Sequence, residues 1–346
     1  MSSLARAHLD RLVKPPGSLG SLEDLAVRLA GILGSARPHL HDPQVLVCAA
    51  DHGIAAHGVS AYPSTVTRQM IGAILSGGAA VSVLARLHDL PITVVDCGVA
   101  DPDPTDHPPA PNPPAAGATL IVAPVAPGTA DATCGPAMSA AQCTRALDRG
   151  REILRGLPGN VVLTGELGIG NTSAASLLMA RLTGEPLSHC VGSGTGVRGS
   201  QLDHKRAVLQ RVLTANLGAD QPEAALAALG GFEIAVLTGV MLEAATQRRV
   251  ILVDGFVTTA AVAVAAALQP AVIDACIFSH VSAEHGHARW LQYLGATPLL
   301  DLRLRLGEAT GAILAWPLLC AATRVLTEMA TLDGAGVSGP QSTGSA

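Results

Sequence analysis

Aromatic residues are scarce in this chain, whose 346 residues include only two Trp, two Tyr and three Phe. Hydrophobic residues still make up 49% of the chain, so a core must be built from Ala, Val, Leu and Ile. Charged residues make up only 14%, and the net charge of −5 forms no basic stripe, which argues against nucleic acid as a partner. The chain is long enough for one large domain or two unequal ones.

The chain also lacks a disulfide pattern and a membrane-spanning segment. Its seven cysteines are scattered, odd in number and never spaced C-x-x-C, which indicates reduced thiols in a cytoplasmic protein. The N-terminus has no apolar signal core. The longest apolar run, 260–268, is too short to cross a bilayer, so we expect no membrane partner.

Lysine is almost absent, because Arg supplies nearly all the positive charge and only Lys14 and Lys205 occur. A retained lysine can mark a compact ammonium group with a particular task. Lys14 begins the string Lys-Pro-Pro-Gly-Ser-Leu-Gly, which two prolines and two glycines force into a turn. This setting makes Lys14 a candidate binding residue.

Short apolar runs alternate with helical patterns through the middle of the chain. We expect strands at 44–50, 91–97, 120–123, 160–164, 249–253 and 271–279. Strands separated by helices predict an α/β fold, with a parallel sheet flanked by helices and joined by right-handed crossovers.

The two ends of the chain have helical patterns instead of strands. We expect residues 1–35 and 301–335 to form a small helical lobe beside an α/β core at 36–300. Such a lobe would bring Lys14 close to Glu308. Residues 101–117 contain seven prolines and are interpreted as an insertion, and 336–346 as a flexible tail.

Polar groups follow several of the predicted strands. They are Asp51-His52, Gly165-Glu166, Asp254-Gly255 and Ser279-His280. Parallel sheets bind ligands at the carboxyl ends of their strands. The repeated pattern therefore predicts a site at that edge of the sheet.

The segment 165–173 joins a strand to a helix through a glycine-rich turn. Backbone N–H groups at a helix N-terminus favour an anion. The turn has neither the Gly-Lys-Thr ending of a triphosphate loop nor the spacing G-x-G-x-x-G, which favours a phosphate monoester. A second glycine-rich turn at 191–196 would close on the same phosphate or on a ribose. The alternative is a tight turn that binds nothing.

Glu308 is a single carboxylate in an otherwise apolar run. Removal from water would raise its pKa toward neutrality and let it accept a proton from a substrate at pH 7. The alternative is a first-turn glutamate stabilised by the dipole of the following helix. Tyr62 lies on a loop, where its ring would stack on a heteroaromatic ligand or simply pack the loop.

The segment 279–287 is rich in histidine and at first suggests a metal site. Zinc sites use His and carboxylate ligands at close spacing. A metal-dependent hydrolase would draw on Asp51, His52, His280, Glu284, His285 and His287. Because no H-E-x-x-H helix occurs, a hydrogen-bonded loop is the better interpretation.

Seven motifs, in order and over nearly the whole chain, resemble the nicotinate-nucleotide–dimethylbenzimidazole phosphoribosyltransferase family. They are K-P-P-G-S-L-G at 14–20, D-H-G-x4-G-V-S-A-Y-P at 51–63, G-E-L-G-I-G-N-T-S at 165–173, G-x-G-T-G at 192–196, D-G-F at 254–256, S-H-x-S-x-E-x-G-H at 279–287 and R-L-G-E-A-T-G-A at 305–312. The chain departs from the family in having Thr-Ser after the Asn and Glu-Ala-Thr in the last motif.

The resemblance implies a homodimer with a parallel α/β core, a small helical lobe and neither metal nor cofactor. The implied reaction moves ribose 5-phosphate from nicotinate mononucleotide to 5,6-dimethylbenzimidazole, which gives α-ribazole 5′-phosphate and nicotinate with inversion at C1′. Glu308 is implied as the general base and Glu166 as a second carboxylate near the sugar. A non-catalytic carrier of the nucleotide or the benzimidazole remains an alternative.

The resemblance also implies the substrate contacts. The phosphate and ribose site would comprise Gly168, Gly170, Asn171, Thr172, Ser173, Ser193, Gly194 and Thr195. The wall of the base pocket would comprise Ser60, Tyr62, Pro63 and Gln69. The remaining candidates for substrate contact are Lys14, Asp254, Ser279 and Gly307.

Overall fold

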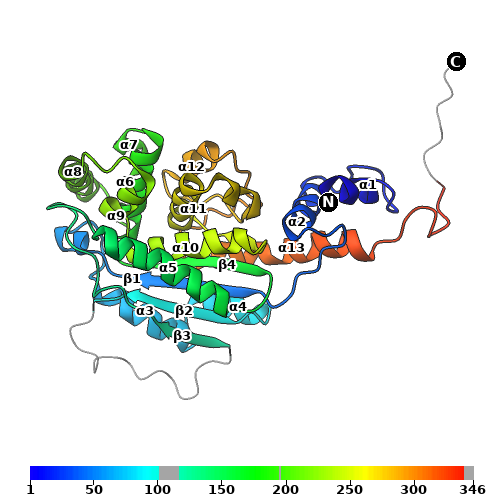
Figure 1. The fold of residues 1–346 in the computed structure, drawn as a ribbon, viewed down its shortest axis with the longest axis horizontal. Coiled ribbons are helices and arrows are strands. Elements are labelled where there is room, and N and C mark those ends of the chain that lie inside the picture. Colours follow the sequence, from blue (N-terminus) through cyan, green and yellow to red (C-terminus); the bar gives the residue numbers. More distant parts are fainter. Residues whose placement is uncertain (101–116, 195, 339–346) are drawn as a thin grey trace. The chain divides into compact units, whose positions relative to one another are not determined.

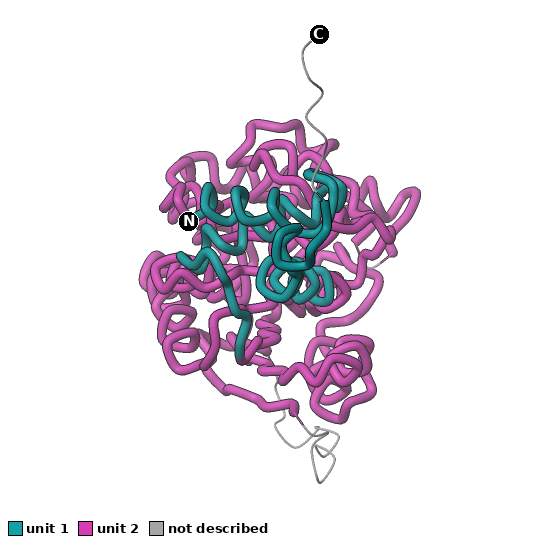
Figure 2. The backbone as a smooth tube through the Cα atoms, turned by 90° about the vertical axis from the view of Figure 1, so that its right-hand side faces the viewer, with its two compact units in different colours: residues 1–41, 316–346 teal, residues 42–315 magenta. Residues whose placement is uncertain are grey.

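The computed structural model describes residues 1–100, 117–194 and 196–338. Residues 101–116 of the predicted insertion lie outside these ranges. Thr195 and residues 339–346 of the predicted tail lie outside them as well. The chain divides into two compact units, one of residues 1–41 with 316–346 and one of residues 42–315 (Figure 2).

The larger unit contains a six-stranded sheet in its described part, and every neighbouring pair of strands is parallel (Figure 1). The strands are β1 Gln44–Ala50, β2 Ile92–Gly98, β3 Ala118–Val122, β4 Val161–Leu167, β5 Val250–Val253 and β6 Cys276–Phe278. Both faces of β1 and β2 are buried, which explains their unbroken apolar sequences. The predicted parallel α/β fold is confirmed.

One predicted strand is wrong over its first half. Residues Pro270–Ala275 form the short 3-10 helix η2, and only Cys276–Phe278 is extended. Pro270 opens η2, where a ring-fixed φ suits the first helical position and no N–H is needed.

Helices surround the sheet. They are η1 Gly53–His57, α3 Thr65–Leu75, α4 Ala80–Leu87, α5 Ala140–Gly156, α6 Asn171–Thr183, α7 Leu187–Cys190, α8 Ser200–Ala215, α9 Pro222–Leu229, α10 Phe232–Thr246, α11 Phe256–Leu268, α12 His287–Tyr293 and the start of α13 Thr310–Glu328. Helix α3 contacts β1, β2 and β3, whereas α10 contacts β1, β2, β4 and β5. Right-handed crossovers place these two helices on opposite faces.

The strands lie in the order β3-β2-β1-β4-β5-β6, so the strand numbers fall as far as β1 and rise from β4 onward, although all the strands are parallel. The loops that leave these two strands separate to opposite faces and leave a crevice at their carboxyl ends. Such a crevice is where open parallel sheets bind ligands. The topology therefore predicts a ligand site among the residues that follow β1 and β4.

The smaller unit contains α1 Ser2–Leu9, α2 Ser21–Leu33 and the part of α13 from Trp316 onward. Within this unit Leu12 and Thr331 form an antiparallel bridge. The ammonium of Lys14 lies 2.8 Å from Glu23 Oε1, and both side chains are buried. The predicted proximity of Lys14 to Glu308 spans the two units and stays a prediction.

The unit boundaries differ from the expected 35/36 and 300/301, and Glu308 lies in the larger unit. Two contacts attach its segment to the sheet. The amide of Glu308 donates to the carbonyl of Glu166 on β4 (3.3 Å). The amide of Ala312 donates to Asp254 Oδ1 after β5 (3.0 Å). Contacts between residues so distant in sequence could not be deduced from helical periodicity.

Two helical stretches, Thr65–Leu87 and Thr310–Glu328, are long and apolar enough to cross a membrane by length and composition. The first is interrupted between α3 and α4, and the second contains Pro317. Buried helices of a globular core share this composition. The expected absence of a membrane partner stays a prediction.

Candidate active site

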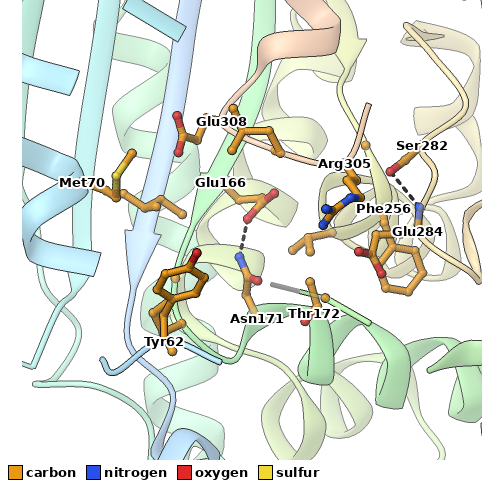
Figure 3. A pocket seen from close by; sticks show the side chains of 18 of the residues that line it. Tyr62, Met70, Glu166, Asn171, Thr172, Phe256, Ser282, Glu284, Arg305 and Glu308 are labelled. Atoms are coloured by element: carbon orange, nitrogen blue, oxygen red, sulfur yellow. Dashed lines mark hydrogen bonds between the residues drawn. The ribbon is translucent and has the colours of Figure 1, made fainter. Parts of the chain in front are cut away.

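A cavity of about 460 Å³ lies at the carboxyl ends of the strands in the larger unit (Figure 3). It is lined by residues from the loops after β1, β4, β5 and β6 and from the segment 305–308. The predicted site residues that line it are Tyr62, Glu166, Gly168, Asn171, Thr172, Gly194, Gly307 and Glu308. The structure thus brings the carboxylate and both glycine-rich turns to one cavity.

Glu308 is presented by an unusual turn. Gly307, Glu308 and Ala309 all have left-handed backbone, with φ of 85°, 59° and 65°. This conformation costs about 1–2 kcal/mol for each residue with a side chain, and such strain is typical of functional sites. A side chain at Gly165 would collide with the backbone of Ala309, so that glycine lets the turn approach β4.

The environment of Glu308 favours its protonated form. Only 3% of the residue is exposed, and burial, followed by the charge of Asp254, raises its pKa to about 7. Its Oε2 has no hydrogen-bond partner among the described residues. Helix α13 begins at Thr310, so the alternative of a first-turn glutamate is wrong. Glu308 is therefore suited to accept a proton near neutral pH.

Glu166 belongs to a group of buried carboxylates. Burial, followed by Asp254, Glu233 and Glu308, raises the pKa of Glu166 well above its ordinary value, against a hydrogen bond donated by Asn171. Like charges this close do not all ionise together. A side chain at position 307 would collide with Glu166 Oε1, which explains the glycine there.

Asp254 and Ser279 do not line the cavity but support its wall. Asp254 Oδ1 accepts the amide of Ala312 and lies 3.7 Å from His280 Nε2. The hydroxyl of Ser279 donates to the carbonyl of Asp254 (3.2 Å). These contacts connect the ends of β5 and β6 to the first turn of α13. Their effect on a ligand would be indirect, through Glu308.

The glycine turn after β4 meets the second turn at Thr172. Lys205 on α8 donates a hydrogen bond to Thr172 Oγ1 (3.2 Å). A Cβ on Gly194 would lie 2.7 Å from the same oxygen and 3.0 Å from the lysine ammonium. Burial, against the charge of Glu284, lowers the pKa of Lys205 to about 8. Two turns and a cation thus meet at the N-terminus of α6.

No sequence motif gives Lys205 a role. The signal that marks it is the scarcity of lysine, which marks Lys14 equally. Lys14 pairs with Glu23 in the smaller unit and is not among the residues that line the cavity. The two lysines differ in their partners, Thr172 for Lys205 and Glu23 for Lys14, and only the structure shows these partners.

Of the four residues predicted for the wall of a base pocket, Tyr62 is the one that lines the cavity. Tyr62 lines the cavity with 54% of its surface exposed, and Val66 and Met70 add an apolar surface from α3. In Figure 3, Tyr62 and Met70 stand on one side of Glu166, with Arg305 on the other. The apolar i, i+4 pair Val66 and Met70 is the pattern that could have been recognised.

Several predicted contacts do not line the cavity. They are Ser60, Pro63, Gln69, Gly170, Ser173 and Ser193. Gly170 and Ser173 nevertheless flank the lining residues Asn171 and Thr172, and Ser60 Oγ accepts the amide of Tyr62 (3.2 Å). Ser60 thus holds the loop that carries Tyr62.

The histidines are engaged separately rather than gathered around one point. His52 Nε2 lies 2.8 Å from Glu233 Oε1. His287 accepts the amide of Ser282 at Nδ1 (2.6 Å), and its Nε2 lies 3.0 Å from Thr259 Oγ1. Burial and His280 lower the pKa of His287 to about 3. In the described part of the chain no three His, Cys, Asp or Glu side chains are arranged to hold a metal ion, so the hydrolase ligand set is not assembled.

The fold and cavity together define an α/β enzyme that can hold an anion at a helix N-terminus beside a proton-accepting carboxylate. A sequence model of the phosphoribosyltransferase family matches residues 1–337. The chain belongs to the nicotinate-nucleotide–dimethylbenzimidazole phosphoribosyltransferase family.

Named relatives cover almost all of the chain. The nicotinate-nucleotide–dimethylbenzimidazole phosphoribosyltransferase of Variovorax paradoxus (strain S110) is 54% identical over 338 residues, 98% of this chain and 94% of the relative. That of Cupriavidus necator is 50% identical over 336 residues, 96% and 94% of the two chains. The crystal structure of CobT from Thermus thermophilus superposes with a TM-score of 0.89 at 43% identity, covering 98% of this chain and 99% of the other.

Proposed function

We propose that the protein transfers ribose 5-phosphate from nicotinate mononucleotide to 5,6-dimethylbenzimidazole. The products are α-ribazole 5′-phosphate and nicotinate, and the configuration at C1′ inverts. The observation that carries the proposal is the shared cavity of Glu308, whose pKa is about 7, and the anion-binding turn after β4. The names of the relatives supply the two substrates.

The charge balance of this reaction needs one base and no acid. One benzimidazole nitrogen attacks C1′ while the bond from C1′ to the pyridinium nitrogen breaks. The bonding electrons return to that nitrogen, which leaves as neutral pyridine nitrogen. The proton on the other benzimidazole nitrogen passes to Glu308. General base catalysis contributes about 10²–10⁴-fold, and holding both reactants together lowers the barrier by roughly 7–11 kcal/mol.

The phosphate is assigned to the N-terminus of α6. Amides of the turn, the hydroxyl of Thr172 and the ammonium of Lys205 offer donors there. Arg305 lines the same cavity and forms no hydrogen bond or ion pair with another described residue. A guanidinium without a partner suits a phosphate or carboxylate of the nucleotide.

Glu166 is assigned to the sugar. The cationic pyridinium of the bound nucleotide would lower the pKa of a nearby carboxyl group, so binding itself favours the ionised form of Glu166. The carboxylate would then stabilise positive charge at C1′ in the transition state. The exposed ring of Tyr62 and the apolar side chains of Val66 and Met70 would enclose the benzimidazole.

A product assay tests the reaction against its alternatives. The protein is incubated with both substrates. The products are identified by mass spectrometry, and their anomeric configuration is determined by NMR. We expect nicotinate and the α-configured nucleotide in equal amounts. A carrier returns both ligands unchanged, and a metal-dependent hydrolase releases ribose 5-phosphate in a manner that a chelator abolishes.

The family resemblance and the free cysteines of the described part support a proposal for the assembly and location of the protein. We propose a homodimer in the cytoplasm. Sedimentation equilibrium of the purified protein measures its mass, and a monomer over the working concentration range would contradict the first part.

A further inference from the structure

A buried ion pair, His52 with Glu233, lies at the switch point of the sheet and takes no part in the mechanism above. His52 follows β1, and Glu233 is in the first turn of α10. Their atoms Nε2 and Oε1 are 2.8 Å apart, with 3% and 0% of the residues exposed. Burial lowers the pKa of His52, but Glu233 and Asp51 raise it further, so the net shift is upward and favours the imidazolium.

The imidazole packs against the glycine turn that carries the proposed phosphate site. A Cβ on Gly170 would lie 3.0 Å from His52 Cβ, and one on Gly168 would lie 3.6 Å from His52 Nε2. Gly170 also has a φ of 106°, which only glycine adopts readily. Gly168 lines the cavity, whereas His52 does not. The histidine therefore supports the turn from the side away from the ligand.

Other contacts restrict the same turn. The amide of Ile169 donates to the buried hydroxyl of Thr67 on α3 (3.1 Å). A side chain at Gly231 would collide with the imidazole of His52 and lie 2.6 Å from Glu233 Oε2. That oxygen has no partner among the described residues. The pair is thus enclosed on several sides, and a shift of His52 would displace the turn.

The charges of the pair also affect the pKa of Glu166, which lines the cavity. Glu233 is one of three carboxylates that raise the pKa of Glu166, together with Asp254 and Glu308. The imidazolium of His52 opposes the charge of Glu233. Removal of one member of the pair therefore changes the field at Glu166, and removal of both changes it least.

We propose that the His52–Glu233 ion pair is a positioning device that holds the 168–171 turn in the geometry that binds the nucleotide phosphate. This inference rests on the proposed function, because that function places the phosphate at the turn. Displacement of a binding element by about 1 Å can cost about 10²-fold in rate or affinity. The pair acts through the turn and does not itself touch the substrate.

The test compares His52→Gln, Glu233→Gln and the double variant with Glu243→Gln. Glu243 is on the same helix, and its carboxylate pairs with Arg155 at 2.7 Å, far from the turn in sequence. We expect each single variant to raise KM for nicotinate mononucleotide by about 10- to 100-fold. The KM for benzimidazole should change by less than about twofold, and the double variant should recover part of the loss, because an unpaired buried charge is the most disruptive state.

A second readout separates positioning from general loss of structure. With glutamate labelled at the side-chain carboxyl carbon, 13C NMR follows the titration of Glu166, assigned by the Glu166→Gln spectrum. The pKa of Glu166 should fall in Glu233→Gln, which removes a negative neighbour, and rise in His52→Gln, which removes a positive one. Loosened packing alone would not produce opposite shifts.

Two results would overturn the proposal: a nucleotide KM unchanged in the folded variants, or a benzimidazole KM raised as much. A single variant that fails to fold leaves the other single variant and the charge-neutral double variant to decide the matter by the same KM comparison. If the wild-type protein forms no product, the proposed function fails. Calorimetric binding of nicotinate mononucleotide to the same variants then still decides the role of the ion pair.

Discussion

The two lysines of the chain lie in opposite electrostatic settings, one in each unit. In the smaller unit, Lys14 is 2.8 Å from Glu23, and although burial acts upward, its charge and hydrogen bond contribute to a lowered pKa of Glu23. In the larger unit, Lys205 donates a hydrogen bond to the neutral hydroxyl of Thr172, and burial, against the charge of Glu284, lowers its own pKa to about 8. Lys14 is thus held in a buried ion pair, whereas Lys205 forms no ion pair with a carboxylate among the described residues.

The glutamates repeat this contrast. Glu23 is buried with a cation, so its charge is compensated within the fold. Glu308 is buried near another carboxylate, and its pKa rises to about 7. A charge that is compensated stabilises structure, while one that is desolvated without a partner is available to a ligand or a proton. The difference separates structural from functional residues of the same type.

Glu308→Gln removes the unpaired carboxylate and should have the largest effect. We expect kcat to fall by at least about 10²-fold, because the amide cannot accept the benzimidazole proton, while KM for nicotinate mononucleotide stays nearly unchanged. Steady-state kinetics at pH 8 measures both constants. Turnover close to that of the wild type would remove Glu308 from the role of base.

Lys205→Met tests the other unpaired group. Loss of a hydrogen bond to a charged ligand is worth about 1.5–3 kcal/mol, so we expect KM for nicotinate mononucleotide to rise by roughly 10- to 100-fold. The KM for benzimidazole should be little affected. Equal increases for both substrates would show that the lysine only supports the fold.

The pKa of Glu308 predicts a pH dependence. The base must be ionised, so kcat/KM should fall about tenfold per unit as the pH drops below about 7. The folded-state pKa lies above the ordinary value of 4.5, so the stability linked to this group is full below about 4.5 and is lost as the pH rises through 7. In thermal melts, the Tm of Glu308→Gln should increase relative to the Tm of the wild type as the pH rises over that range. A pH-independent difference between the two Tm values would contradict the shift.

Lys14→Met should act on stability. It leaves the buried carboxylate of Glu23 without its closest cation, and an unsatisfied buried group costs about 1–3 kcal/mol. We expect a lower Tm that the double variant Lys14→Met/Glu23→Leu partly restores. A raised nucleotide KM with an unchanged Tm would instead return Lys14 to the binding role predicted from its motif.

Arg305→Gln should have the smallest effect. Its side chain is exposed at the cavity, and exposed ion pairs contribute about 0.2–1 kcal/mol, so KM for the nucleotide should rise by no more than about fivefold. The increase should shrink at high salt. Arg324→Gln, which changes an exposed arginine of the smaller unit, is the matched control. An increase that salt does not alter would contradict a simple charge interaction.

Much of the fold and site could be predicted from the sequence because the signals are local. Apolar runs that end in Asp51, Glu166 and Asp254 are visible in the chain, and parallel pairing brings their ends to one edge. The strand at 271–279 was overextended because apolar residues of a short 3-10 helix resemble those of a buried strand. The spacing of Val66 and Met70 places them on one face of a helix, but how α3 packs decides that this face borders the cavity.

The parallel α/β fold, the glycine turns and the isolation of Glu308 in an apolar run can all be predicted from the chain alone. Which charged groups are paired depends on folding. Lys14 pairs with Glu23, which is nearby in the chain. Lys205 contacts Thr172, and Glu308 interacts with Asp254, across long separations in sequence. The physical reason is that burial and the distance to other charges set a pKa, and both are properties of the folded chain rather than of any motif.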